Sequence, residues 1–214
     1  MISIQRFVCN MLQENCYVVS DESKECVIID CGAWYTQERS AIVSYISSNG
    51  LTPRHLLATH GHVDHNFGNN TIFDTYGLKA EVHKSDISFM ERLAEQSVQF
   101  IGCKPDFEYP PVGDTFVDGD EITFGSHKLA VVHTPGHSRG SVCFYIKDEN
   151  VMFTGDTLFH QSIGRTDLDG GSMMQIIQSL RMLAQLPDET VILPGHGPQT
   201  TISEELRSNP FLDR

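Results

Sequence analysis

The stretch Thr59-His60-Gly61-His62-Val63-Asp64-His65 places three imidazoles and a carboxylate within six consecutive positions. It follows an apolar, strand-like run at 55–58 and precedes residues 66–69, which are typical of the opening of a helix. Polar residues between a strand and a helix occupy a position where α/β proteins commonly build sites. Alternate residues of an extended segment point to the same side, so His60 and His62 can share one cation, while Asp64 and His65 face a second. An exposed histidine-rich turn is the alternative, but ligand spacing of this kind rarely arises by chance.

Three further candidate ligands follow apolar strand-like runs elsewhere in the chain. His137 lies in a Thr-Pro-Gly-His turn after the run at 129–132, Asp156 follows 151–153, and His196 follows 191–193 in Pro-Gly-His-Gly-Pro. A single such residue is more often a cap or a turn residue, but several that all close strands favour one shared site. The full set is sufficient for two cations that share a carboxylate: His60, His62, Asp64, His65, His137, Asp156 and His196.

The hydrophobic pattern predicts a protein of the α/β (α+β) class with strands dominant in its core. Two rounds of strands followed by helices indicate two sheets that pack face to face with helices outside. At 214 residues, a single domain over 1–214 is expected. Strands are predicted at 2–8, 15–20, 25–30, 54–59, 79–83, 121–124, 127–133, 141–146, 150–154 and 190–194, helices at 37–48, 66–76, 84–94, 171–185 and 202–208, and a loop at 100–114.

Composition narrows the classes of partner. The chain carries 15 Lys and Arg against 28 Asp and Glu, a formal charge of −13, which disfavours nucleic acid as a partner. No apolar run approaches the roughly 18 residues of a membrane span, so no membrane partner is expected. The first residues lack the features of a signal peptide, and the six cysteines show no paired short spacing. We expect a cytoplasmic protein with reduced thiols and a small-molecule substrate, and the sequence leaves the oligomeric state open.

Several further segments carry a family resemblance together with the histidine motif. They are Gln13-Glu14-Asn15-Cys16-Tyr17, Asp30 with Gly32, Thr134-Pro135-Gly136-His137, Gly155-Asp156-Thr157-Leu158-Phe159, Gly164-Arg165-Thr166-Asp167, Pro194-Gly195-His196-Gly197-Pro198 and Asn209-Pro210-Phe211-Leu212. The chain resembles the metallo-β-lactamase fold and, within it, the glyoxalase II-like (hydroxyacylglutathione hydrolase-like) branch, closest to its short, single-domain members. The resemblance implies a four-layer αββα sandwich with a metal site at one edge of the two sheets.

The resemblance also implies a distribution of the ligands. His60, His62 and His137 would hold one metal, Asp64, His65 and His196 the other, and Asp156 would bridge them, with Asp30 as a support. Imidazole and carboxylate donors suit zinc and also iron or manganese. We therefore expect two divalent metal ions per chain, with Zn²⁺ as the first choice.

The expected activity is that of a dinuclear metallohydrolase acting on a thioester, S-D-lactoylglutathione or a similar acyl-thiol. A hydroxide bridging the two ions is the predicted nucleophile, and Asp64 and Asp156 are the predicted catalytic residues that hold and orient it. A thioester suits such a site because a thiolate with a pKa of ~8.5 leaves without a dedicated general acid. His160 and Arg165 are candidate substrate-binding residues, although an Arg165–Asp167 pair is more often scaffolding.

Other functions remain open at this point. A persulfide dioxygenase, from a related branch, would use a single Fe(II) held by His60, His137 and Asp156. A protein that binds metal without catalysis is a further class, but a structural zinc needs four ligands rather than seven. Branches of the fold that cleave RNA or β-lactams fit less well with the acidic composition and the expected cytoplasmic location.

Overall fold

The computed structural model describes residues 1–213 and contains two six-stranded sheets. Neighbouring strands of the first sheet are β1 (Ser3–Cys9), β2 (Glu14–Ser20), β3 (Glu25–Ile29), β4 (Thr52–Leu57), β5 (Ala80–His83) and β6 (Thr115–Phe116). The pairs from β1 to β3 are antiparallel and those from β3 to β6 are parallel. Parallel neighbours need a crossover, which α1 (Thr36–Ser48) supplies between β3 and β4, and α2 (Asn69–Tyr76) between β4 and β5.

The second sheet is built from the later part of the chain. Its strands, in spatial order, are β14 (Thr200–Thr201), β13 (Val191–Pro194), β10 (Val151–Gly155), β9 (Val142–Ile146), β8 (His127–His133) and β7 (Glu121–Phe124). β10 and β13 are parallel and are joined through α5 (Met173–Leu183), whereas the other neighbours are antiparallel. A short hairpin of β11 (Leu158–Phe159) and β12 (Ser162–Ile163) follows β10, and α6 (Ile202–Ser208) follows β14.

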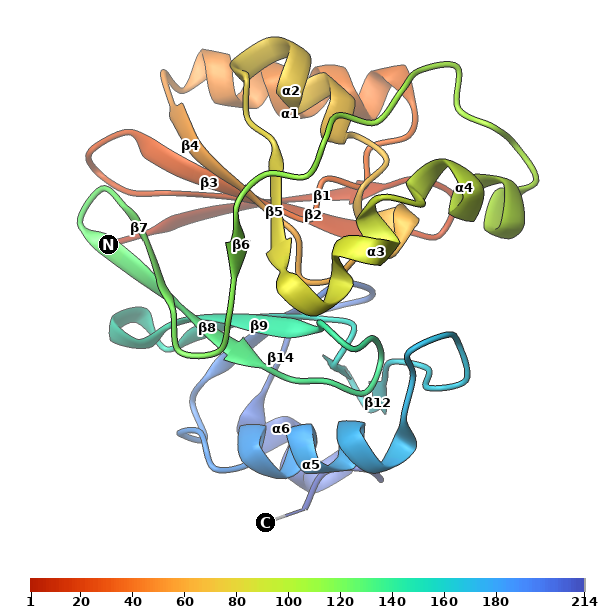
Figure 1. Ribbon diagram of the computed structural model, residues 1–214. Helices are drawn as coiled ribbons and strands as arrows, with labels where there is room; N and C mark the ends of the chain where they lie inside the picture. The colour runs from red at the N-terminus through yellow and green to blue at the C-terminus, as the bar shows by residue number, and fades with distance from the viewer. Residues whose placement is uncertain (214) are drawn as a thin grey trace.

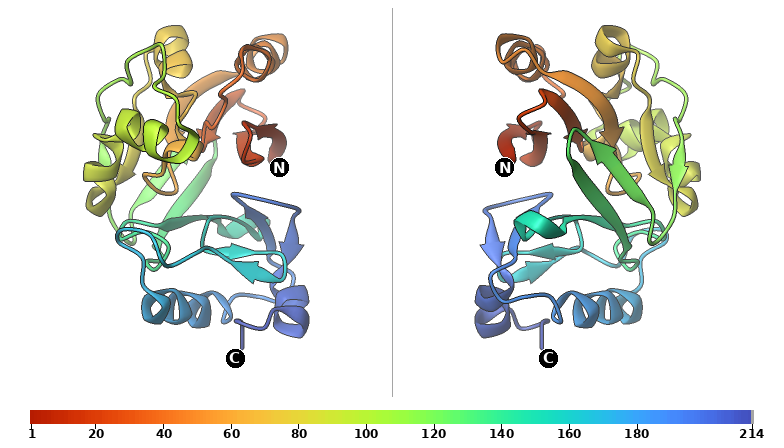
Figure 2. Two further views of the ribbon diagram at one scale, coloured as in Figure 1. Left: turned by 90° about the vertical axis from the view of Figure 1, so that its right-hand side faces the viewer. Right: turned by 90° about the vertical axis from the view of Figure 1, so that its left-hand side faces the viewer.

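Four layers result, because the helices α1 and α2 cover one sheet while α5 and α6 cover the other (Figure 1). Figure 2 shows the layers from two sides, with the sheets facing each other. Alternate strand residues enter different apolar layers: Cys16 and Val18 of β2 pack toward α1 and α2, whereas Tyr17 and Val19 pack between the sheets. The predicted αββα sandwich is confirmed, and the period-two alternation of apolar side chains is its physical basis.

Some predicted boundaries are wrong. The helix predicted over 84–94 is a turn of 3₁₀ helix, η2 (Lys84–Asp86), then α3 (Ile87–Met90), then α4 (Leu93–Ile101). The buried Asp86 side chain turns inward to accept hydrogen bonds from the Gly61 and Gly140 N–H groups, and this long-range anchoring fixes the start of the segment. α4 runs into the predicted loop at 100–114 and ends at Gly102, whose φ of +69° is left-handed.

The helix predicted at 66–76 begins at Asn69, because the chain first makes a 3₁₀ turn, η1 (Val63–His65). The strands β6, β11, β12 and β14 were not expected, since two residues are too few to show a hydrophobic period. A further 3₁₀ turn, η3 (Lys147–Glu149), links β9 to β10. Across residues 1–213, no helix is both long and apolar enough to span a bilayer.

Candidate metal centre

The histidine motif leaves the end of β4 and is held by buried side chains from neighbouring segments. Asn66 donates its amide hydrogens to the carbonyls of His60 and His62, at 3.2 and 2.7 Å. Gln96 of α4 accepts from the Val63 N–H and donates to the Gly61 carbonyl, both at 3.1 Å. These bonds fix an irregular backbone, and they aim the motif's side chains at one edge of the sheets.

A first group of ligand atoms consists of three imidazole nitrogens. His137 Nε2 lies 2.8 Å from His62 Nδ1 and 3.2 Å from His60 Nε2. Tetrahedral zinc, with Zn–N bonds of about 2.0–2.1 Å, separates its ligand nitrogens by about 3.4 Å. His137 Nδ1 donates to the Arg165 carbonyl at 2.8 Å, so its Nε2 presents a lone pair to the group. The spacing and the bare nitrogen fit a shared cation.

A second group lies beside the first. Its atoms are Asp64 Oδ2, His65 Nε2 and His196 Nε2. The Asp64 oxygen lies 3.8 Å from His65 Nε2 and 3.4 Å from His196 Nε2. Outer hydrogen bonds orient both rings: His65 Nδ1 donates to Asp30 Oδ2 at 3.0 Å, and His196 Nδ1 donates to the Leu12 carbonyl at 3.1 Å. In the neutral form of these rings, both Nε2 atoms face the carboxylate with their lone pairs.

Asp156 stands between the two groups. Its Oδ1 lies 3.3 Å from His65 Nε2 and 3.7 Å from His196 Nε2, whereas its Oδ2 lies 3.5 Å from His137 Nε2. The approach depends on Gly195, where an added Cβ would come within 2.5 Å of Asp156 Oδ1. One carboxylate therefore presents a different oxygen to each group, which is the arrangement of a bridging ligand.

Burial tunes the charge of these groups. It lowers the pKa of His62 to about 4 and that of His60 well below its usual value, with a further contribution from neighbouring imidazoles. Both rings are therefore neutral near pH 7, the state in which an imidazole binds a metal. Burial opposes ionisation of Asp156, but the surrounding imidazoles, His65 first, hold its pKa well below the ordinary range.

Buried atoms without partners test whether this set fits metal ions. His65 Nε2 and Asp156 Oδ1 are buried and have no hydrogen-bond partner among residues 1–213, although they lie 3.3 Å apart. Leaving such polar atoms unpaired in the interior costs about 1–3 kcal/mol each. A cation held at the second group would satisfy both atoms, so the residues fit a metal ion there.

The support predicted for Asp30 is confirmed. Its Oδ1 accepts from the Thr59 N–H at 2.7 Å, and its Oδ2 accepts from Thr59 Oγ1 at 2.7 Å and from His65 Nδ1. Thr59 Oγ1 also lies 3.0 Å from His60 Nδ1, so one aspartate braces a ring of each ligand group.

Two buried carboxyl groups near the site were not predicted from the sequence, Asp86 and Glu14. Asp86 joins the two ligand-bearing loops, because it accepts from the Gly61 N–H at 2.9 Å and the Gly140 N–H at 2.6 Å. Glu14 lies beside His65, fully buried and without a hydrogen-bond partner in the described part of the chain, and burial raises its pKa above the usual value of a carboxyl group. The sequence gives no local signal for Asp86, since its partners are distant: the two glycines are 25 and 54 positions away.

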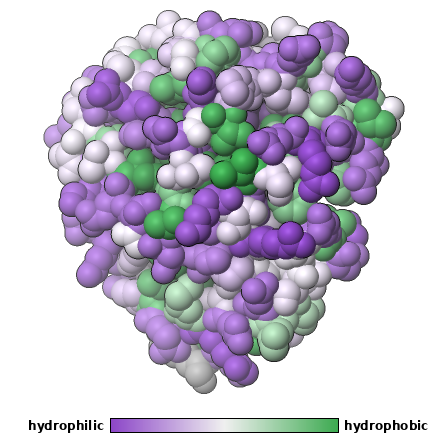
Figure 3. Space-filling model, in the orientation of Figure 1, coloured by the Kyte–Doolittle hydropathy of each residue, from purple (hydrophilic) through white to green (hydrophobic). Residues whose placement is uncertain are grey.

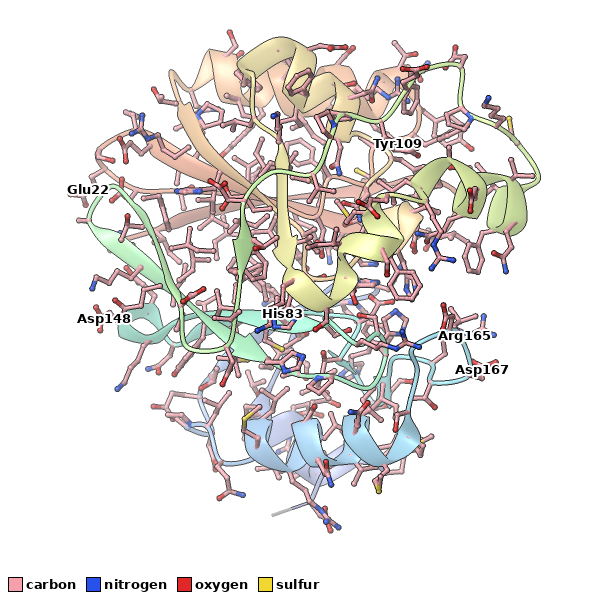
Figure 4. All side chains as sticks on the ribbon, in the orientation of Figure 1. Glu22, His83, Tyr109, Asp148, Arg165 and Asp167 are labelled. Atoms are coloured by element: carbon pink, nitrogen blue, oxygen red, sulfur yellow. The ribbon has the colours of Figure 1, made fainter. Side chains whose placement is uncertain are left out.

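A cavity of about 260 Å³ opens onto both ligand groups. Figure 3 shows the molecule notched at the right-hand edge, where Figure 4 places Arg165 and Asp167. The residues that line it are Leu12, His62, Val63, Asp64, Phe100, His137, Asp156, Arg165, Leu168 and His196. The cavity thus joins a metal-ligand floor to a partly apolar wall.

The structure places the two candidate substrate-binding residues differently. Arg165 lines the cavity and forms two 2.8 Å hydrogen bonds to Asp167 at the exposed rim. The ring of His160 instead contacts the buried Glu205 at 3.1 Å and Thr200 at 3.4 Å. A substrate role for His160 stays a prediction, and the sequence provided no signal for Leu12 or Phe100 as lining residues.

Comparisons with known proteins agree with this geometry. Residues 9–196 match the family model of the metallo-beta-lactamase superfamily. The hydroxyacylglutathione hydrolase GloC of Haemophilus influenzae is 34% identical over 203 residues, covering 94% of this chain and 93% of the relative. The crystal structure of BLEG-1 B3 metallo-beta-lactamase superposes with a TM-score of 0.88 at 34% identity, covering 98% of this chain and 99% of that chain. TTHA1623 in a di-iron-bound form superposes with a TM-score of 0.82, also at 34% identity, covering 97% and 100%. With both its sequence and its fold matching over nearly their whole length, the chain belongs to the metallo-beta-lactamase superfamily.

Proposed function

We propose that this superfamily hydrolase cleaves thioesters, S-D-lactoylglutathione or a similar acyl-thiol, with two divalent cations, zinc first, held by the seven-residue set. The observation that carries the proposal is the completeness of the second group, Asp64, His65 and His196, together with Asp156 facing both groups. A mononuclear site would need only the first group with one carboxylate. The similarity to GloC supports the thioester substrate, and the similarity to a di-iron-bound structure supports two ions.

The chemistry follows from the positions of the chain's own groups. Two divalent cations, when bound, lower the pKa of a water between them towards 7 and polarise the substrate carbonyl. Asp64 and Asp156 orient the attacking water by accepting its hydrogen bonds at the floor of the cavity. Hydrolysis forms a bond from the water oxygen to the acyl carbon and breaks the C–S bond, which releases a carboxylate and a thiol.

The leaving group decides between thioesters and amides. Every imidazole and carboxylate among the described residues that line the cavity belongs to a ligand group, so none is free to protonate an amine. A thiolate with a pKa of ~8.5 leaves without such a donor. This distinction favours a thioester as the substrate.

The test is a hydrolysis screen on the zinc-loaded protein, with S-D-lactoylglutathione among the acyl-thioesters. Asp64→Ala is expected to lower turnover by at least about 100-fold and to reduce the bound metal from about two ions to about one, since it removes a second-group ligand. Asp74→Ala, at an exposed position of α2, is the matched control and should change neither quantity. Metal content is measured by mass spectrometry and turnover by thiol release.

Three outcomes would contradict the proposal. Normal thioester hydrolysis by Asp64→Ala would remove the role of the second group. Oxygen uptake with glutathione persulfide, by protein holding a single iron, would favour the dioxygenase instead. Hydrolysis of a β-lactam in preference to every thioester would align the protein with BLEG-1, to which its fold is similar.

A further inference from the structure

Part of the cavity lining is hydrocarbon, and we call this part the hydrocarbon wall. Leu12, Phe100 and Leu168 form it, and they come from three separate parts of the chain. Leu12 is 47% exposed and Phe100 41% exposed, although both lie beside the ligand groups. Single exposed apolar residues are ordinary on protein surfaces, but apolar side chains gathered at a cavity mark a place where an apolar ligand group binds.

Hydrogen bonds and a ring contact fix the position of the wall relative to the candidate metal ligands. The Leu12 carbonyl accepts a hydrogen bond from His196 Nδ1, and the Leu12 N–H donates one to Asn10 Oδ1 at 2.8 Å. The Asn10 side chain in turn donates to the Asp64 carbonyl. Phe100 lies in the last turn of α4, with its ring centroid 6.4 Å from that of His62. These links place the wall next to the point where a thioester carbonyl must sit.

The charged residues at the mouth of the cavity do not favour binding of an anionic thiol carrier against the hydrocarbon wall. Arg165 is the cation among the described lining residues, and Asp167 already holds it through two hydrogen bonds. Phe100 and Leu168 also line a smaller hollow with Arg92, and Arg92 shares Asp169 with Arg139, at 3.6 and 3.3 Å. Among the described residues that line the cavity itself, no Lys or Arg side chain other than Arg165 is available to a carboxylate or phosphate.

We propose that Leu12, Phe100 and Leu168 form an acyl-binding wall, so that the protein prefers thioesters of unbranched hydrocarbon acyl groups over α-hydroxyacyl groups. This inference rests on the proposed thioester hydrolysis and narrows its substrate class. The thiol carriers of biological thioesters contain amides and charges, which cannot form hydrogen bonds with this wall. The alkyl chain of an acyl group has no hydrogen bonds to lose when the wall buries it. An α-hydroxyl group placed against the wall loses its hydrogen bonds to water, which disfavours an α-hydroxyacyl substrate. Each methylene of an alkyl chain that the wall buries raises kcat/KM by up to about fourfold.

The experiment measures kcat/KM of the zinc-loaded protein with N-acetylcysteamine thioesters, whose carrier is uncharged. The acyl groups are acetyl, butyryl, hexanoyl and lactoyl. We expect kcat/KM to rise about two- to fourfold per methylene from acetyl to hexanoyl, and the lactoyl thioester to fall below the butyryl one. A parallel series with a fixed acetyl group and alkanethiols of increasing length probes the leaving-group side.

Variants assign the preference to the wall. Phe100→Ala and Leu12→Ser should each lower the ratio of kcat/KM for hexanoyl to acetyl by about three- to tenfold, because less of the chain is buried. Val98→Ala is the matched control: Val98 is exposed on the same helix and lies outside the cavity lining, so this ratio should stay within twofold of wild type.

The outcomes separate this inference from the proposed function. A flat chain-length series on protein that hydrolyses acetyl and lactoyl thioesters would overturn the acyl wall and leave thioester hydrolysis standing. A rise confined to the alkanethiol series would overturn it too, since the wall would then bind the leaving group. Failure to cleave any thioester would overturn the proposed function and this inference with it.

Discussion

Replacing Asp30 by asparagine tests whether a residue that touches no cation controls the second ligand group. Asparagine keeps the size of the side chain and tolerates the left-handed φ of +53° at this position. It offers one acceptor oxygen, whereas Asp30 accepts hydrogen bonds from the Thr59 N–H, Thr59 Oγ1 and His65 Nδ1. The orientation that keeps the Thr59 N–H paired turns the amide NH₂ toward His65 Nδ1, which favours the tautomer with a proton on Nε2.

That proton lies where the second group must offer a lone pair. Loss of such a supporting partner typically weakens metal binding 10- to 100-fold, or about 1.4–2.7 kcal/mol. We expect this loss at the group of Asp64, His65 and His196, and a change within about threefold at the group of His60, His62 and His137. His60 retains its contact with Thr59 Oγ1, 3.0 Å away, which accounts for the smaller effect.

Competition between the protein and a chromophoric zinc chelator resolves the two affinities. Asp21→Asn is the matched control, because Asp21 is also buried and also bonded to an imidazole, at 3.1 Å from His127 Nδ1, but its partners are not metal ligands. The control should leave both affinities unchanged. Two unchanged affinities in Asp30→Asn, or equal weakening at both groups, would refute the reasoning from His65.

Two further predictions concern stability. Asp86→Ala leaves the N–H groups of Gly61 and Gly140 without their acceptor. We expect the free energy of unfolding, measured by urea denaturation, to fall by roughly 2–5 kcal/mol. A change below about 0.5 kcal/mol would show that water replaces the carboxylate. Burial alone would raise the pKa of Asp21, but hydrogen bonds from Ser126, Ser23 and His127 outweigh it and hold the pKa below its ordinary value. Its contribution is therefore complete above the unfolded-state pKa of about 3.9 and is lost as the pH falls toward the lower folded-state pKa. Urea midpoints of wild type should accordingly fall more between pH 5 and about 3 than those of Asp21→Asn, and parallel declines would contradict this assignment.

The residues near the site differ in how far the sequence could predict them. The convergence of the seven candidate ligands was predictable because each is a metal-binding type placed after an apolar strand, where Gly and Pro shape the turn. The structure brings all seven together. The inward turn of Asp86 was not predictable, because its partners belong to other segments of the chain and leave no local pattern.

The fold shows the same division. Period-two alternation in strands such as β2 identifies the two sheets, since each side chain has one of two apolar layers to enter. The break between α3 and α4 depends on contacts such as those of Gln96 with Gly61 and Val63, which appear only when the segment is docked. The apolar wall at Leu12 and Phe100 likewise exists only in the assembled molecule.

The origin of the ligands has a consequence for how the molecule matures. His60 and His137 are 77 positions apart and follow strands of different sheets, and His196 comes later still in the chain. A nascent chain therefore has no complete cage until both sheets have formed and met. A cation held by these residues would therefore bind after the sheets have docked, and its binding free energy would stabilise only the assembled molecule.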